Sequence, residues 1–149
     1  MALSDVKKAT AYDLGKGEKK YDNTTDVFKY VIITEGFSSI DEDATSIGIA
    51  NYTKVVSTGA YVQDVTIANT TWTQTGNISA LKGDSFNFAA DPSNPVTGKT
   101  IAIYNDTSAA KDVVVFVDLT TDGGTTPADT TLGLNYTVNA SGIAITTTN

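Results

Sequence analysis

The chain of 149 residues contains no cysteine, no histidine and no arginine. Without cysteine and histidine it cannot form disulfides, Cys/His zinc sites, thiol nucleophiles or histidine-based catalytic pairs. Without arginine it lacks the side chain that most often binds phosphates bidentately and reads base edges. These absences exclude the common routes to catalysis and argue against nucleic-acid binding.

Long hydrophobic runs are also missing. No stretch approaches the ~20 apolar residues that a membrane-spanning helix needs, and the first 20 residues contain no apolar core of a secretory signal. We therefore expect neither a membrane segment nor a secretory signal. A hydrophobic fraction of 40% and a length of 149 residues are typical of one folded globular domain with a sizeable core.

Charge is unevenly distributed along the chain. The net charge is −7, but the first 29 residues hold six of the ten lysines against five carboxylates, about +1. The remaining residues therefore carry about −8. An acidic body of this kind repels nucleic acid and favours solubility, so no nucleic-acid partner is expected.

Residues 1–26 differ in composition from the rest. They are rich in Lys, Asp and Gly, carry isolated apolar residues and keep neither a helical nor a strand period. We interpret them as an extended N-terminal arm that docks on a neighbouring subunit; the alternative is a frayed terminus. The expected partner-binding residues of this arm are its apolar anchors and nearby lysines: Leu3, Val6, Lys7, Lys8, Tyr12, Leu14, Lys19, Lys20 and Tyr21.

Residues 27–149 read as a β-domain. Short apolar or alternating segments separated by turn residues predict strands at 27–34, 47–56 (one strand or two), 61–67, 70–75, 78–81, 85–88, 101–104, 113–119, 134–138 and 143–146. Turn signals every 8–12 residues, without a long amphipathic helix, indicate an all-β fold, a single small β-sandwich or a related closed β-fold. Within the predicted strand at 113–119, the unbroken β-branched and aromatic run VVVFV predicts a central strand that is covered on both faces.

Candidate chemistry is sparse. Adjacent acids at Asp41, Glu42 and Asp43 could contribute oxygen ligands to Ca²⁺, but a solvated loop is the stronger interpretation. The single tryptophan, Trp72, is interpreted as a packed strand residue in preference to a sugar-stacking platform. We predict no catalytic residues, no bound metal and no cofactor.

Several motifs together resemble a known group of proteins. They are YNDT at residues 104–107, the strand VVVFVD at 113–118, and NASGI at 139–143, with DNTTDVFKYVIIT at 22–34 resembling a first strand. The order of these motifs is similar to that in small virion proteins of tailed bacteriophages, found among head and structural gene products. The segments 35–43 and 120–130 are longer than the corresponding loops of that group.

This resemblance implies a capsid decoration (cement) protein. Such a protein binds the outside of an assembled phage head, staples neighbouring subunits of the major capsid protein, and associates as trimers or clusters. The implied location is the exterior of the virion, after synthesis in the host bacterial cytoplasm.

Two other interpretations stay open at this point. One is a tail, fibre or baseplate component with a receptor- or glycan-binding surface, which clustered exposed aromatics would favour. The other is a carboxylate enzyme, which needs two acids facing each other across a cleft.

Overall fold

The computed structural model describes residues 6–11, 22, 25–75, 78–84, 86–88, 91, 93–94, 98–119, 136–138 and 143–148. The secondary structure there consists almost entirely of strands, so the predicted all-β class is confirmed. The strands are β1 (Val6–Lys8), β2 (Phe28–Ile33), β3 (Val65–Thr66), β4 (Thr71–Thr75), β5 (Ile78–Gly83), β6 (Phe86–Phe88), β7 (Thr100–Asn105), β8 (Val113–Asp118), β9 (Tyr136–Val138) and β10 (Ile143–Thr148). Two single 3-10 turns accompany them, η1 (Phe37–Ser39) and η2 (Ile49–Asn51).

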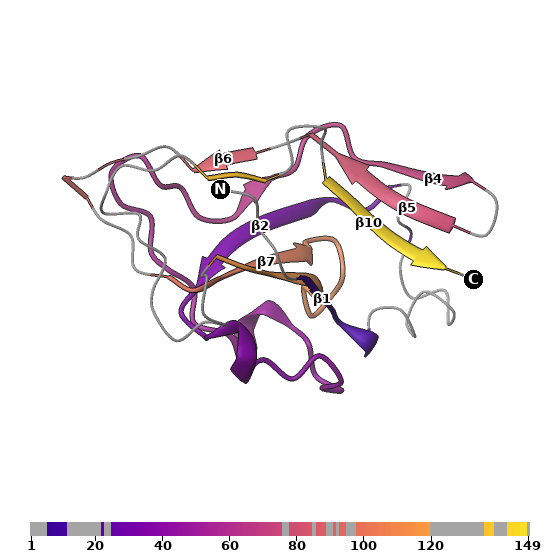
Figure 1. Cartoon of the computed structure of the whole chain (residues 1–149), viewed down its shortest axis with the longest axis horizontal. Helices are drawn as coiled ribbons and strands as arrows, with labels where there is room; N and C mark the ends of the chain where they lie inside the picture. Colours follow the sequence, from indigo (N-terminus) through magenta and orange to yellow (C-terminus); the bar gives the residue numbers. More distant parts are fainter. Residues whose placement is uncertain are drawn as a thin grey trace.

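The main sheet has five strands in the order β1-β8-β7-β2-β3, and every neighbouring pair is antiparallel (Figure 1). The predicted pair of strands around residues 101–119 forms its centre as β7 and β8. All residues of these two strands are buried. The expectation that the VVVFV run is covered on both faces is therefore confirmed.

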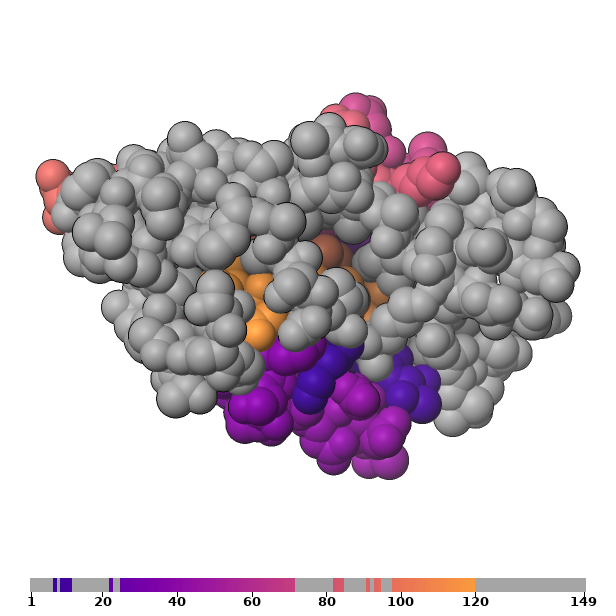
Figure 2. All heavy atoms as spheres, viewed as in Figure 1, coloured from indigo at the N-terminus to yellow at the C-terminus, as the bar shows by residue number. Residues whose placement is uncertain are grey.

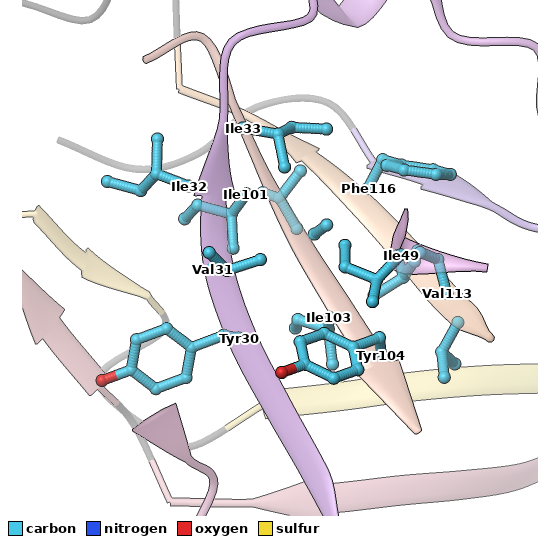
Figure 3. Close-up of a cluster of buried hydrophobic side chains, with 14 of the residues drawn as sticks. Tyr30, Val31, Ile32, Ile33, Ile49, Ile101, Ile103, Tyr104, Val113 and Phe116 are labelled. Atoms are coloured by element: carbon cyan, nitrogen blue, oxygen red, sulfur yellow. The ribbon is translucent and has the colours of Figure 1, made fainter. Parts of the chain in front are cut away.

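Both faces of this sheet carry apolar side chains. Val31, Ala102 and Phe116 lie in one row across β2, β7 and β8. The ring of Tyr52, which follows η2, meets Phe116 edge-on at 5.1 Å between ring centroids. The segment with η1 and η2 therefore covers this face, and Figure 3 shows Ile49 of η2 on the same side as Phe116.

The opposite face is packed as closely. Ile32 of β2 lies opposite Ile101 of β7 in the register. Gly98 lies so near that a Cβ atom there would be 2.0 Å from Cγ2 of Ile32. The chain before β7 therefore requires glycine at this position, because any larger residue would displace the β2 side chain.

Two smaller sheets complete the described structure. β4, β5 and β10 form one in the order β10-β5-β4, and β6 pairs with β9 in the other. The strands predicted at 70–75 and 78–81 are present as β4 and β5, which pair with each other with Thr75 opposite Ile78. The three-stranded sheet meets the end of β3, where the Asn69 amide donates to Asp84 at 2.7 Å. In Figure 1 this sheet and the η1–η2 segment lie on opposite sides of β2 and β7.

Two strand predictions are wrong in whole or in part. Residues 47–56 form η2 and isolated bridges, because Gly48 pairs with Asp112 and Lys54 with Ile33 instead of one continuous neighbour. Residues 61–67 are a strand only at β3. Asp64 has a left-handed φ of 59°, which interrupts an extended strand before Val65.

The N-terminal segment contributes to the main sheet. β1 pairs with the edge of β8, with Val6 opposite Val117 and Lys8 opposite Val115. Part of the segment expected to be an arm is thus a strand of the chain's own sheet. The expected boundary after residue 26 stays a prediction, and residues 1–5, 12–21, 23 and 24 lie outside the described residues.

Candidate functional site

The YNDT motif forms the end of β7 and the turn that follows it. Asn105 is fully buried, and its Oδ1 accepts hydrogen bonds from the backbone N–H groups of Thr107 (3.0 Å) and Ser108 (3.2 Å). Its amide nitrogen donates to the carboxylate of Asp26, just before β2. The hydroxyl of Thr107 accepts from the N–H of Val27 at 2.9 Å. The motif therefore ties the β7–β8 turn to the start of β2.

Asp106 carries the charge of this turn. Its carboxylate is paired with Lys111 and with Lys29, the latter at 2.8 Å. Hydrogen bonds from Lys111 and then Lys29 lower the pKa of Asp106 and outweigh the opposing effect of partial burial. The side chain is thus an ionised anchor between β2 and the turn, with both carboxylate oxygens already used by cations.

A second polar cluster surrounds Asp64. Both of its oxygens accept from the Lys54 ammonium at 3.0 Å, and the Tyr104 hydroxyl and the Gln63 amide donate at 3.0 Å and 3.1 Å. Partial burial alone would raise the pKa of Asp64, but these hydrogen bonds lower it overall. Burial and the bond to Asp64 in turn raise the pKa of Tyr104. Every partner stabilises the carboxylate, so this cluster is built as a structural ion pair.

The loop at residues 54–64 is held in one conformation by internal bonds. Thr58 and Tyr61 exchange two backbone hydrogen bonds, of 3.1 Å and 2.9 Å, and Gly59 between them has a φ of +53°. Asp91 accepts from the N–H of Ala60 at 3.0 Å. The Tyr61 hydroxyl accepts from the N–H of Ile32, and burial raises the pKa of Tyr61 to about 12. The loop is therefore anchored on the main sheet.

This loop exposes apolar surface. Val56 and Val62 are 74% and 58% exposed, more than any other large hydrophobic side chain in the part of the chain that the structure describes. Residues 55–63 contain no charged side chain, although the chain as a whole is strongly acidic. A rigid, neutral, apolar projection is what one protein offers to another, because little ordering entropy and little charge desolvation oppose the contact. We call residues 56–62 the valine loop.

Sequence reasoning missed the valine loop. Valine has a high strand propensity, so the sequence pattern places Val56 and Val62 in predicted strands at 47–56 and 61–67. The absence of charge over residues 55–63 does not single this loop out, because longer uncharged stretches occur at residues 65–81 and 130–149. The exposure of Val56 and Val62 could not be predicted from the sequence, because it depends on which other segments pack against these residues in the fold.

The acidic loop at residues 41–43 lies against the N-terminal segment. Glu42 is 3.6 Å from the Lys7 ammonium, and Asp43 accepts from the Thr10 hydroxyl at 2.7 Å. Asp41 accepts from the backbone N–H of Asp43. No group of three or more metal-ligating side chains gathers anywhere in the described residues. Within this part of the chain, the three acids therefore bind the Lys7 ammonium, the Thr10 hydroxyl and a backbone N–H group.

An open hollow of about 540 Å³ lies between residues 45–51 and 109–112. Gly48 is one of the lining residues, and a Cβ atom there would be 2.8 Å from the carbonyl oxygen of Ala110. Asp112 is the one carboxyl residue among the residues that line it. This hollow therefore lacks the pair of facing acids that glycoside hydrolysis needs.

The predicted site residues divide into two groups. Val6, Lys7 and Lys8 form β1, and Lys7 contacts Phe37 and Glu42 of its own chain. The remaining six lie outside the described residues: Leu3, Tyr12, Leu14, Lys19, Lys20 and Tyr21. Trp72 has its backbone on β4 opposite Leu81, and its side chain is not among the described ones.

No helix in the described part of the chain is long and apolar enough to cross a membrane. No protein-family model matches the chain, and no curated protein or solved structure matches it.

Proposed function

We propose that this chain is a non-enzymatic virion structural protein, a capsid decoration or cement protein that binds the outer surface of an assembled phage head and stabilises it. The proposal starts from the resemblance of the YNDT, VVVFVD and NASGI motifs to small virion proteins. It is supported by the use of the YNDT residues, whose polar groups are engaged within the fold. Because the YNDT residues stabilise the fold, we place the binding function in other residues, at the surface of the protein.

The proposed partner is the major capsid protein, and the observation that carries this choice is the valine loop. A decoration protein binds a shell that is already assembled, and a contact surface that is ordered before binding loses little entropy when it binds. The backbone bonds between Thr58 and Tyr61 provide that order. Val56 and Val62 provide apolar area free of the repulsion that the acidic body would otherwise bring.

The N-terminal segment, residues 1–26, is the second proposed contact. In this proposal the domain is a β-sandwich, and the extended part of the segment reaches a neighbouring subunit. Copies associate as trimers or clusters on the exterior of the virion after synthesis in the bacterial cytoplasm. Weak contacts made by several copies together would then add up to stable attachment.

Shell binding by a V56S/V62S double variant tests this proposal. Both valines are exposed in the free chain, so the variant should keep its midpoint of urea unfolding. In the complex with the head both would be buried, so their replacement should weaken binding to undecorated heads about tenfold or more. Binding is measured by co-sedimentation of the protein with heads over a concentration series.

Val27 supplies the matched control, because it is also exposed, at 41%, but lies outside the valine loop. V27S should bind heads as the unsubstituted chain does. Failure of the unsubstituted chain to bind heads would reject the decoration function. Equal binding by V56S/V62S would reject the valine loop as the contact.

A further inference from the structure

We propose that β1 is an exchangeable strand: when copies assemble, residues 6–11 of one copy leave their own sheet and pair with β8 of a second copy. The receiving surface, here called the acceptor site, consists of the β8 edge together with Phe37, Ile40, Glu42 and Asp43. In Figure 2 the indigo atoms of the N-terminal segment lie against the purple atoms that follow β2. This inference concerns the chain alone and does not depend on binding to a shell.

The backbone of residues 6–11 is hydrogen-bonded first to strand β8 and then to the loop that contains Glu42. β1 pairs with residues 115–117 of β8, and the pairing extends one step further, where the N–H of Ala9 donates to the carbonyl of Val114 at 3.1 Å. Ala9 is 1% exposed. The N–H of Thr10 donates to the carbonyl of Glu42 at 3.0 Å. These bonds link residues far apart in sequence and could be made equally by another copy's segment.

Lys7 supplies the side-chain contacts. Its ammonium donates to the carbonyl of Ile40 at 3.1 Å, lies 3.6 Å from Glu42 and sits 5.0 Å from the centre of the Phe37 ring. One lysine thus meets a carbonyl, a carboxylate and an aromatic face in a single site. Such a site recognises an extended basic segment with a small residue two positions after the lysine.

Charge favours the same occupant. Residues 6–11 contain two lysines and no acid, whereas the acceptor site contains Glu42 and Asp43, which follow a third acid, Asp41. Copies of a chain with net charge −7 repel one another overall. An exchanged strand brings the locally positive part of one copy to the locally negative part of the next, which offsets that repulsion.

The topology permits exchange. β1 and β2 are separated in the sheet by β8 and β7, a distance of about 14 Å for three strand spacings. The chain between them, residues 9–27, can span up to roughly 60 Å when extended. The connection is therefore long enough for β1 to reach its own β8 or that of an adjacent copy.

The acceptor site needs an occupant. Without β1 the apolar strand β8 would present an unpaired edge, which is a template for pairing with another chain. A strand of three residues is weakly held by itself, so it opens more readily than the centre of the sheet. When two copies meet, a neighbour's segment competes with the chain's own segment for the same contacts.

Engineered disulfides test the exchange, because the chain has no cysteine of its own. The bond from Ala9 to Val114 makes that pair hydrogen-bonded, so Val6 and Val117 form a non-hydrogen-bonded pair, whose short separation suits a disulfide. V6C and V117C single variants, one carrying a size tag, are mixed at equal concentration, refolded together from urea and oxidised. Non-reducing electrophoresis then separates the mixed dimer from each dimer of one variant.

Exchange predicts about tenfold more mixed dimer from V6C with V117C than from V6C with V56C. Val56 is 74% exposed and lies outside the acceptor site, so V56C measures random collision. Equal yields in the two mixtures would overturn the proposal. K8C with V115C, the other non-hydrogen-bonded pair, repeats the test if V117C does not fold. No shell is present, so the result is separate from that of the decoration proposal.

Discussion

Asn105 shows how one buried amide can define a turn. Its Oδ1 serves the N–H groups of Thr107 and Ser108, which would otherwise be unpaired at the end of β7. Its other end reaches Asp26. Asparagine fits because its amide offers an acceptor and a donor at opposite corners, whereas aspartate would place a second carboxylate against Asp26.

Replacing Asn105 by alanine should lower the free energy of unfolding by about 2 kcal/mol, because buried donors and the Asp26 carboxylate lose their partner. The measurement is the midpoint of urea unfolding at an unchanged m-value. Asn51 is the control, since its amide also bonds within a turn but is exposed. N51A should cost less than half as much, and equal losses would contradict the role given to burial.

Asp106 makes stability depend on pH. Its pKa is lowered in the folded state, so the folded protein binds fewer protons than the unfolded chain. The contribution of Asp106 is therefore complete above the unfolded-state pKa and is lost as the pH falls through the lower, folded-state pKa.

At pH 7, D106N should be less stable than the unsubstituted chain by about 1 kcal/mol, because the pairs with Lys29 and Lys111 are lost. The difference in unfolding free energy between the two chains should become smaller as the pH falls from ~5 towards ~2, since neither chain then has a negative charge at residue 106. Urea midpoints across this range measure it. A gap that stays constant with pH would show that the carboxylate's charge is not what stabilises the turn.

At the scale of elements, β1 differs from the other strands of the main sheet. β2, β7 and β8 are apolar runs that would be buried in any arrangement of this fold, whereas VKK has no strand signature. It becomes a strand because the β8 edge supplies a ladder and the 37–43 segment supplies partners for Lys7. Because β1 is a strand only through its contacts with these neighbours, we expect the rest of the sheet to fold without it.

Deleting residues 2–11 should leave a folded chain that is less stable by about 2–3 kcal/mol and self-associates through the uncovered β8 edge. Urea unfolding and sedimentation velocity measure the two effects. Adding a synthetic peptide of residues 1–11 should reverse this additional self-association, and a peptide of scrambled order should not. A truncated chain with unchanged stability and mass would show that β1 contributes nothing to the sheet.

The whole molecule separates its scaffold from its surface. The polar groups of the YNDT motif make hydrogen bonds within the β7–β8 turn, while the most exposed large apolar side chains in the described part lie in the neutral valine loop. The positive and negative portions of the chain meet where β1 contacts residues 41–43. The described part of the chain is thus buried and apolar at its centre, and its charged and exposed apolar contacts lie at the edges.

The all-β class, the central strand β8 and the strands β4 and β5 could be predicted from the residues alone, because β-branched and aromatic residues favour strands locally. Tertiary structure alone decided the fate of residues 47–56 and the pairing of β1. A valine is buried or exposed, and a Val-Lys-Lys segment is a strand or a loop, according to the neighbours it meets. In this chain those neighbours lie up to about a hundred residues away, as Lys7 and Phe116 do.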